Sequence, residues 1–453
     1  MKQLILLLDG TWDDADTGAC DTNIVRLRSI LDRSLDANSS GFPSENARGP
    51  LTHLRTYQGD DVEHVVFYER GVGTGVLFDA VAGGAFGDGL NGNIRRAYKF
   101  ISFHYEPGDE IYIFGFSRGA FTARSVAGYI AAAGLLRREA CTAELEQQAW
   151  EYYRCPPSDR LPGAWSALTP HVWPREKLVI EALAVFDTVG ALGIPFKVFM
   201  QANRAKYGFH DVENNPIVRN SLQALAIDEH RAPFEATVWH QQPFRTFSGR
   251  VEQVWFAGAH GDIGGAIVPE LTRETLDPHS LDDLSLDWML KRLNALCPSF
   301  PVNRELAWKH VDSAWSLTRQ NEPRQGLWRL LPLSLRAIAN VPAVLPKLSY
   351  SRVGNYDRHA MPLAEMVHVS VIERLGSDVV IANEGLSYQP PNLMRVLDHI
   401  YATYGAMPGL PKLRPEIRIV DWNGRDLDPF APDERARAVD LLQAARTRLR
   451  TTT

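Results

Sequence analysis

Short runs of consecutive apolar residues recur along the first part of the chain, and stretches with helical spacing of apolar residues separate several of them. Such runs, without polar alternation, are typical of strands that are buried on both faces of a parallel sheet. The pattern therefore predicts an α/β fold with a mainly parallel, doubly wound sheet. The expected strands are residues 3–8, 65–68, 110–116, 178–186 and 251–257.

Beyond residue 270 the pattern changes to helical segments that are rich in Trp and Leu and interrupted by Pro. Residues 284–296 have helical spacing and stop at Cys297-Pro298, and residues 432–453 predict a short charged helix. We expect a core over residues 1–270 with an insertion at about 136–177, a helical cap over 271–365, and a C-terminal extension over 366–453 that completes the fold.

The composition is that of an ordinary globular protein. With 45% hydrophobic and 23% charged residues in 453, the chain does not fit the disordered, collagen-like or disulfide-scaffold classes. Its formal net charge of −6 argues against general affinity for nucleic acid or anionic lipid. The four cysteines are widely spaced, which predicts reduced thiols and neither a zinc site nor a redox pair.

We expect no targeting or membrane-spanning segment. The apolar run before Asp9 is too short for a secretory signal, and no run approaches the roughly 18 apolar residues of a membrane helix. The chain is therefore expected to be cytoplasmic as synthesised, with any export following a route without a cleaved signal peptide.

One stretch departs from the acidic average of the chain. Residues 323–353 contain no acidic residue and are apolar and basic, with Arg324, Arg329, Arg336, Lys347 and Arg352. Two interpretations stay open for this stretch: a cap over the sheet, or a lid or lipid-facing element of the interfacial type.

Ser117 is the most informative residue for chemistry. It is the serine of a G-x-S-x-G sequence, Gly115-Phe116-Ser117-Arg118-Gly119, between an expected strand and a small-residue helix over residues 120–133. A nucleophile elbow needs this context, because its serine lies in a strained turn and its glycines let strand and helix approach closely. The motif predicts Ser117 as a nucleophile.

A serine hydroxyl needs a base and a third group that holds the base. His260 follows an expected strand within a glycine-rich loop and is the expected base, with His368 as the alternative. Asp187 follows another expected strand and is the expected acid. Asp262 is the alternative acid, although it could instead hold the loop of His260 through backbone hydrogen bonds. The order serine, aspartate, histidine is the one that α/β-hydrolases use.

An acyl transfer also needs backbone N–H groups to bind the oxyanion. One is expected from Arg118, which follows the nucleophile. The second is expected from Gly10 or Thr11, which close the first strand, with Asp9 ordering that loop.

Two alternatives to a serine nucleophile involve phosphate or a metal ion. Asp9-Gly10-Thr11 is reminiscent of aspartyl-phosphate phosphatases, but the nucleophile of that motif would fall on Leu7, which cannot act as one. A hard-cation site built from Asp9, Asp187, His260 and Asp262 would instead support metal-dependent phosphoester hydrolysis.

Several ordered motifs together resemble a known family. They are Asp9-Gly10-Thr11-Trp12, Thr22-Asn23, Gly71-Val72-Gly73-Thr74, residues 115–124, residues 186–190, residues 255–265 and, more weakly, Asp228-Glu229-His230-Arg231 and His368-Val369-Ser370-Val371. The chain resembles the α/β-hydrolase domain family that includes type VI secretion phospholipase effectors. The resemblance implies an α/β-hydrolase fold, a triad on Ser117, Asp187 and His260, and hydrolysis of glycerophospholipid esters by antibacterial toxins.

The hypothesis from the sequence is a serine ester hydrolase, a phospholipase or lipase that needs no cofactor and no metal. Expected partners are a lipid or other ester substrate, a membrane surface contacted through residues 323–353, and secretion-spike and immunity proteins, but not nucleic acid. The alternatives are an esterase on soluble small-molecule or carbohydrate esters and a catalytically silent binding protein of the same fold.

Overall fold

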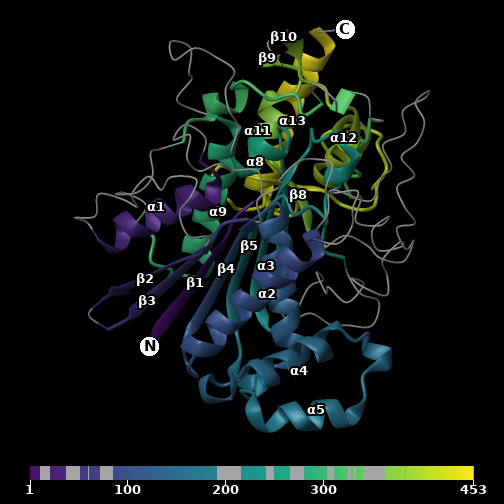
Figure 1. Cartoon of the computed structure of the whole chain (residues 1–453). Helices are drawn as coiled ribbons and strands as arrows, with labels where there is room; N and C mark the ends of the chain where they lie inside the picture. Colours follow the sequence, from purple (N-terminus) through teal and green to yellow (C-terminus); the bar gives the residue numbers. More distant parts are fainter. Residues whose placement is uncertain are drawn as a thin grey trace. The chain divides into compact units, whose positions relative to one another are not determined.

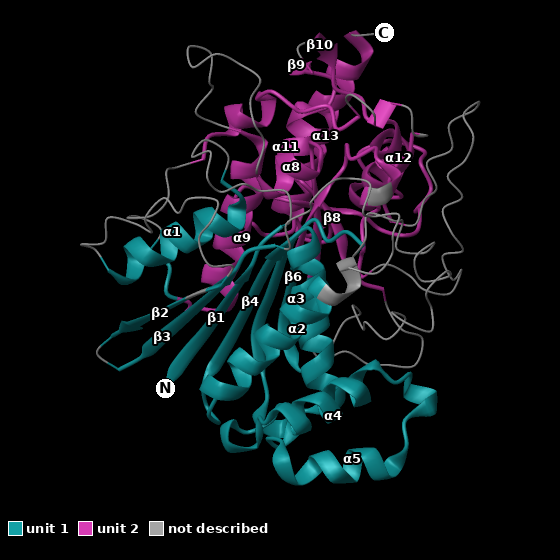
Figure 2. Ribbon diagram, in the orientation of Figure 1, with its two compact units in different colours: residues 1–222, 244–251, 301–307 teal, residues 223–243, 252–300, 308–453 magenta. Residues whose placement is uncertain are grey.

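A computed structural model (Figure 1) describes residues 1–10, 21–36, 52–59, 61–71, 85–190, 216–240, 249–265, 280–303, 311–324, 328–329, 333–339, 363–382 and 384–451. The chain divides into two compact units (Figure 2). Unit 1 comprises residues 1–222, 244–251 and 301–307, and unit 2 comprises residues 223–243, 252–300 and 308–453.

Among the described residues, nine strands form one sheet in the order β11-β8-β7-β6-β5-β4-β1-β3-β2. They are β1 (Lys2–Leu8), β2 (Thr52–Gln58), β3 (Glu63–Glu69), β4 (Glu110–Phe116), β5 (Ile180–Phe186), β6 (Val218–Ala226), β7 (Arg250–Phe256), β8 (Glu365–His368) and β11 (Arg418–Val420). β1 runs parallel to β3 and β4, β4 runs parallel to β5, and β8 runs parallel to β7 and β11. The edge strand β2 is antiparallel to β3. The expected mainly parallel α/β sheet is confirmed.

The described α-helices are α1 (Asn23–Leu35), α2 (Ala85–His104), α3 (Arg118–Ala133), α4 (Ala143–Arg154), α5 (Pro162–Leu168), α8 (His260–Gly264), α9 (Leu281–Leu296), α11 (Val369–Arg374), α12 (Pro391–Tyr404) and α13 (Pro432–Thr451). In unit 1, α1, α2 and α3 pack against strands of the sheet (Figure 1). A separate two-stranded hairpin consists of β9 (Asp378–Ile381) and β10 (Glu384–Ser387). No described helix is long and apolar enough to cross a membrane.

β1 explains why an unbroken apolar run is the signature of this sheet. It lies between β3 and β4, so both of its edges are hydrogen-bonded, and Leu4 to Leu8 are each at most 1% exposed, so the side chains on both of its faces are buried. On the face of unit 1 that carries α2 and α3, the rings of Tyr98 and Tyr129 stack at 3.9 Å, and the Tyr98 hydroxyl donates to the Gly134 carbonyl. Aromatic stacking and hydrogen-bonded hydroxyls thus hold these two helices together.

The segment expected as an insertion leaves the sheet after α3 and returns at β5. It contains α4 and α5, and an antiparallel bridge between Leu136 and Val172 joins its two ends. Glu146 of α4 is buried and forms a two-pronged ion pair with Arg95 of α2, with 2.9 Å from Arg95 Nε to Glu146 Oε1. This segment is therefore held within unit 1 by the bridge between its ends and by a buried ion pair with α2.

The glycines of the G-x-S-x-G sequence let β1, β4 and α3 pack at backbone distance. A Cβ on Gly115 would lie 2.6 Å from the Gly119 carbonyl oxygen. A Cβ on Gly119 would overlap the carbonyl oxygens of Leu8 and Asp9 at the end of β1. Because the neighbours are backbone atoms, no rotamer change can make room for a side chain at either position.

Unit 2 has its own apolar core, to which Trp255, Tyr388, Ile400 and Leu442 belong. The helix expected at 284–296 begins earlier, at Leu281, because the Asp283 side chain accepts the Ser280 N–H in a capping box. It ends at Cys297, as expected. The expected C-terminal helix is α13, which buries Ala438, Leu442 and Ala445.

All five expected strands are present, but β2, β6, β8 and β11 were not anticipated from the apolar pattern. β6 contains buried polar residues: Asn220 donates to the Glu181 carbonyl at 2.9 Å, and Gln223 donates to Gln253 Oε1 at 3.1 Å. Hydrogen bonds thus satisfy the polar side chains that interrupt the buried apolar residues of this strand. β8 and β11 span only four and three residues, too few to show a period.

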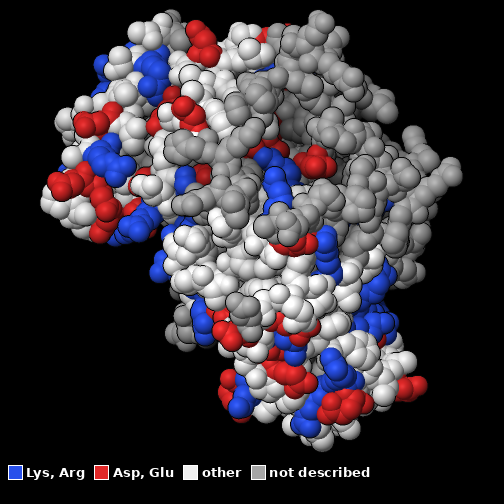
Figure 3. Space-filling model, turned by 90° about the vertical axis from the view of Figure 1, so that its left-hand side faces the viewer, with Lys and Arg blue, Asp and Glu red and all other residues white. Residues whose placement is uncertain are grey.

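The charged side chains are mixed on the face drawn in Figure 3. Lys and Arg lie among Asp and Glu there, and neither sign forms a continuous field on the described surface of that face. This distribution agrees with the modest net charge of −6.

Gly119→Ala is expected to lower the free energy of unfolding by about 3 kcal/mol or more, because its methyl group would overlap two backbone carbonyls. Gly163→Ala is the matched control: this helical glycine has no atom within 4 Å of the added Cβ, and the change should be neutral or stabilising by up to about 1 kcal/mol. Urea unfolding of the two variants tests this. Equal stability of Gly119→Ala and the unmodified protein would contradict the packing argument.

Candidate active site

Ser117 lies in a strained turn between β4 and α3. Its backbone has φ 58° and ψ −121°, a conformation that non-glycine residues rarely adopt, and its side chain is 4% exposed. Ser117 is also the N-cap residue of α3, yet its hydroxyl makes no capping hydrogen bond to the helix. The hydroxyl is therefore not engaged in the role that serine most often has at a helix start.

Unit 1 brings Ser117 and Asp187 to adjacent strand ends. Phe116 of β4 is paired with Phe186 of β5, and the Ser117 N–H donates to the Phe186 carbonyl at 3.1 Å. Asp187 is fully buried and also has a positive φ, 41°. Both candidate residues thus occupy strained positions directly after parallel strands, where functional groups of α/β sheets gather.

Asp9 organises the loop that follows β1. Its Oδ1 accepts the Gly10 N–H at 2.8 Å, and its Oδ2 accepts the hydroxyls of Thr22 at 2.9 Å and Tyr68 at 2.8 Å. Burial raises the pKa of Asp9 to about 6, although these hydrogen bonds and the charge of Arg28 oppose the rise. Thr22 also caps α1, so Asp9 connects the β1 loop to that helix.

The backbone around the end of β1 and the start of α3 contains two of the three expected oxyanion donors, Arg118 and Gly10. Gly119 packs against the Asp9 carbonyl, so the start of α3 and the end of β1 are in contact. The Arg118 N–H belongs to the first turn of α3, where N–H groups have no partner within the helix. The Gly10 N–H already donates to Asp9, so it could bind an oxyanion only by giving up that bond. Thr11 lies outside the described residues.

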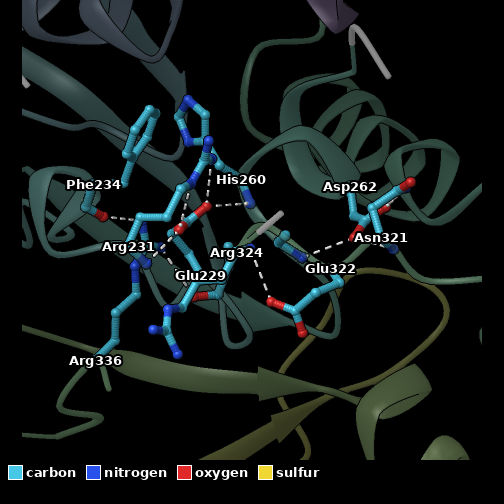
Figure 4. A network of polar contacts seen from close by, with 11 residues as sticks. Glu229, Arg231, Phe234, His260, Asp262, Asn321, Glu322, Arg324 and Arg336 are labelled. Atoms are coloured by element: carbon cyan, nitrogen blue, oxygen red, sulfur yellow. Dashed lines mark hydrogen bonds and ion pairs between the residues drawn. The ribbon is translucent and has the colours of Figure 1, made fainter. Parts of the chain in front are cut away.

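His260 is in unit 2, as the first residue of α8. It is mostly buried, and its backbone N–H points to Glu229 Oε2 at 3.4 Å (Figure 4). Its imidazole meets the ring of Phe234 edge to face, with 5.2 Å between centroids. The glycine-rich loop predicted from the sequence is thus fixed by contacts of both the backbone and the side chain of His260.

Asp262 holds the loop of His260 together. Its Oδ2 accepts the N–H groups of Ala259 at 2.8 Å and Asn321 at 3.1 Å, and its Oδ1 accepts the Asn321 side-chain amide at 2.6 Å. Gly258, with φ 116°, lies so close to Asp262 that a Cβ there would overlap the aspartate side chain. Burial raises the pKa of Asp262 to about 7 despite these hydrogen bonds. Both oxygens of the alternative acid are therefore occupied within unit 2.

His368, the alternative base, is packed as a core residue. Its ring stacks on Phe256 at 4.7 Å and meets Trp422 edge to face, while Nδ1 lies 2.8 Å from the Ser370 hydroxyl. Burial, with the nearby charge of Lys291, lowers the pKa of His368 to about 3. A base this weak and this enclosed is poorly suited to accept a proton from a serine at neutral pH.

The basic stretch from 323 to 353 is not a uniformly exposed surface. Arg336 is buried and donates to the backbone carbonyls of Ala226 at 2.9 Å and Phe234 at 2.5 Å. Arg336 therefore adds no charge to the surface of this stretch, because its guanidinium binds backbone carbonyls inside unit 2. Arg329 is exposed, whereas Lys347 and Arg352 lie outside the described residues.

The described residues contain no group of three or more His, Cys, Asp or Glu side chains that could hold a metal ion. Two members of the hard-cation alternative, Asp9 and Asp262, have raised pKa values and accept hydrogen bonds from within their own units. Their present geometry serves loop structure.

Sequence reasoning gave no role to three residues that support the loop of His260. Glu229 contacts its backbone, Asp228 Oδ2 accepts the Gly258 N–H at 2.7 Å, and Asn321 binds Asp262. The motif Asp228-Glu229-His230-Arg231 was the available signal for the first two. No sequence signal was available for Asn321, because nothing in its local sequence indicates a partner 59 residues away.

The raised pKa of Asp262 predicts a pH-dependent stability term. An aspartate titrates near 3.8 when unfolded, so the stability gained from its neutral, buried form is complete below that pH and is lost as the pH rises towards 7. Asp262→Asn removes this term. Between about pH 5 and about pH 8, the unfolding free energy of Asp262→Asn should rise by about 2 kcal/mol relative to that of the unmodified protein. Parallel pH curves in urea unfolding would contradict it.

Part of the chain is similar in sequence to a yeast protein. The chain is 27% identical over 265 residues to the uncharacterized protein YEL023C of Saccharomyces cerevisiae, a match that covers 54% of this chain and 33% of the yeast protein. The chain therefore spans about a third of the length of that relative.

Two solved structures are distantly similar. One is an uncharacterized protein from Pseudomonas aeruginosa, with TM-score 0.36 and 16% identity, covering 68% of this chain and 47% of that one. The other is the Tle1 effector bound to the VgrG spike of the type VI secretion system, with TM-score 0.31 and 18% identity, covering 60% of this chain and 52% of that one.

The family model for the catalytic domain of Tle1-like phospholipase effectors of the type VI secretion system matches residues 2–292. This range is more than half of the chain and contains β1 to β7, the strained turn at Ser117 and the loop of His260. The chain belongs to the family of Tle1-like catalytic domains of type VI secretion phospholipase effectors.

Proposed function

We propose that the chain is a serine ester hydrolase that cleaves phospholipid or related lipid esters. The observation that carries the proposal is the conformation of Ser117: a positive φ between strand and helix, flanked by two glycines that admit no side chain. An α/β-hydrolase nucleophile needs this strained turn, and an ordinary serine at a helix start has no reason to adopt it.

In the proposed reaction, the Ser117 hydroxyl attacks the ester carbonyl while His260 accepts its proton, and His260 then protonates the leaving alcohol. Asp187 orients His260 and stabilises the imidazolium that forms. The Arg118 N–H and a second N–H from the β1 loop, from Thr11 or from Gly10, bind the oxyanion. The acyl group is then bonded to the Ser117 oxygen. Water attacks its carbonyl while His260 accepts a proton from the water, and His260 protonates the Ser117 oxygen as the carboxylic acid leaves.

The pairing of Ser117 with His260 is proposed from the sequence and from the position of each residue after its own strand. It is supported by the chain order Ser117, Asp187, His260, which is the order of the triad in α/β-hydrolases. Ser117, Asp187 and His260 each follow the carboxyl end of a strand, namely β4, β5 and β7, and α/β sheets carry their reactive groups there.

Asp187 is the better candidate for the triad acid. Asp262 already accepts three hydrogen bonds within unit 2, and a pKa of about 7 leaves it partly protonated at neutral pH. A triad acid has to remain ionised to stabilise the imidazolium. Asp262 is therefore better suited to stabilising the conformation of the His260 loop.

The lipid substrate class and delivery by type VI secretion follow from the family and are part of the proposal. Contact with a spike protein, described for the Tle1 effector in its solved structure, stays a prediction for this chain, as do an immunity partner and membrane contact through residues 323–353.

Ser117→Ala is expected to lower turnover of phospholipid or short-chain p-nitrophenyl esters by about 10³-fold or more, because it removes the nucleophile. A fluorophosphonate probe should label the unmodified protein and not this variant. Ser166→Ala, which removes an exposed hydroxyl that bonds to the Pro162 carbonyl of its own helix, is the control and should keep both signals. Unchanged turnover in Ser117→Ala would refute the serine mechanism, and an unlabelled native protein would indicate a silent member of the family.

Asp187→Asn and Asp262→Asn distinguish the two acids when they are compared side by side. Asp187→Asn should reduce kcat by about 10⁴-fold, because an amide cannot stabilise the imidazolium. Asp262→Asn should reduce kcat by less than about 10-fold at a pH where both variants are folded. The reverse ranking in steady-state kinetics would transfer the role of acid to Asp262.

A further inference from the structure

The Asp228-Glu229-His230-Arg231 motif contains a buried ion pair that the proposed reaction does not use. Glu229 is 1% exposed and receives three hydrogen bonds from Arg231: 2.8 Å from its backbone N–H, 2.9 Å from Nε and 2.7 Å from the terminal guanidinium nitrogen (Figure 4). A carboxylate held in this way has a fixed position, because both of its oxygens are bound by one planar group.

The pair reaches His260 by two routes, directly through Glu229 and indirectly through Arg231 and Phe234. Glu229 Oε2 faces the backbone N–H of His260 at 3.4 Å, which places the carboxylate at the first residue of α8. The Arg231 guanidinium lies 3.7 Å from the centre of the Phe234 ring, and Phe234 meets the His260 imidazole edge to face. A continuous set of contacts therefore runs from Glu229 through Arg231 and Phe234 to the imidazole.

The surroundings keep Glu229 ionised. Burial alone would raise the pKa of Glu229, but the hydrogen bonds and charge of Arg231, with the charges of Arg336 and His260, lower it overall. Trp328 contributes to the enclosure, with its ring centre 5.4 Å from the Arg231 guanidinium. The pair is thus a charged element beside the candidate base, with the Glu229 side chain fully buried and that of Arg231 17% exposed.

We propose that the Glu229–Arg231 pair is a positioning device for His260, in which Glu229 fixes the backbone of the histidine and Arg231, through Phe234, fixes its ring. This inference rests on the proposed function, because it assigns His260 the role of base. Glu229 and Arg231 are positioning residues, which act through His260 and need not touch the substrate. Catalytic geometry of this kind has to be held to within a fraction of an ångström.

A second buried pair in the same unit offers a matched control. Arg292 binds Glu252 through Nε at 2.7 Å and through a terminal nitrogen at 2.6 Å, and both residues are largely buried. Glu252 lies near the start of β7, whereas His260 follows the end of that strand. Glu252→Gln therefore breaks an ion pair of the same chemistry at the other end of the strand.

Glu229→Gln should lower kcat on a lipid ester by about 10²-fold and leave KM within about twofold, since misplacing a catalytic group by about an ångström costs this much. Glu252→Gln should leave kcat per folded molecule nearly unchanged. Phe234→Leu, which keeps the ion pair and a similar side-chain volume, should lower kcat by about 10-fold. Near-UV circular dichroism and urea unfolding give the folded fraction by which each rate is divided.

The same substitution in a His260→Ala background identifies the route of the effect. If Glu229 acts through His260, then Glu229→Gln should have no further effect on the residual rate of His260→Ala. An additive loss in the double variant, or equal kcat losses in Glu229→Gln and Glu252→Gln, would overturn the positioning role while the proposed function stands. Full activity of His260→Ala would instead overturn the assignment of His260 and the inference with it.

Discussion

The close approach of α3 to the ends of β1 and β4 is the constraint on which the candidate site of unit 1 depends. Gly115 and Gly119 leave room for backbone only, so the helix begins directly against the carbonyls of Leu8 and Asp9. A helix that starts this close to the strands forces the connecting residue, Ser117, into a positive φ. The strain is maintained because tight packing on both sides of the turn leaves no relaxed alternative.

Buried carboxylates organise the loops that leave the sheet. Asp9 holds the β1 loop, Asp228 and Asp262 hold the loop between β7 and α8, and each is surrounded by hydrogen-bond donors. Burial raises the pKa of all three, so part of the desolvation cost is avoided by protonation. The buried aspartates give these loops a defined backbone conformation, but they lower the stability of the fold at higher pH, where they have to ionise.

The sequence predicted the sheet and its strand ends well because both have local signatures. Apolar runs without alternation marked β1, β4 and β5, and glycine-bracketed turns marked Ser117 and His260. β6 was not predicted because it contains polar residues that look exposed in the local sequence. These residues are buried and bind partners distant in the sequence, as Gln223 binds Gln253. The burial of Arg336 could not be predicted for the same reason: its acceptors, the carbonyls of Ala226 and Phe234, are about a hundred residues away in the sequence.

Glu229 differs from Asp9, Asp228 and Asp262 because its pKa is lowered, not raised. The difference follows from its partner: a guanidinium supplies full positive charge and a matching geometry, whereas the other three carboxylates rely mainly on neutral donors. Since Glu229 and Arg231 are together neutral, their field at the His260 ring is smaller than that of a lone carboxylate. Any influence on catalysis has to come mainly from the fixed geometry of the pair, which acts on kcat through the orientation of His260 and leaves substrate binding largely unchanged.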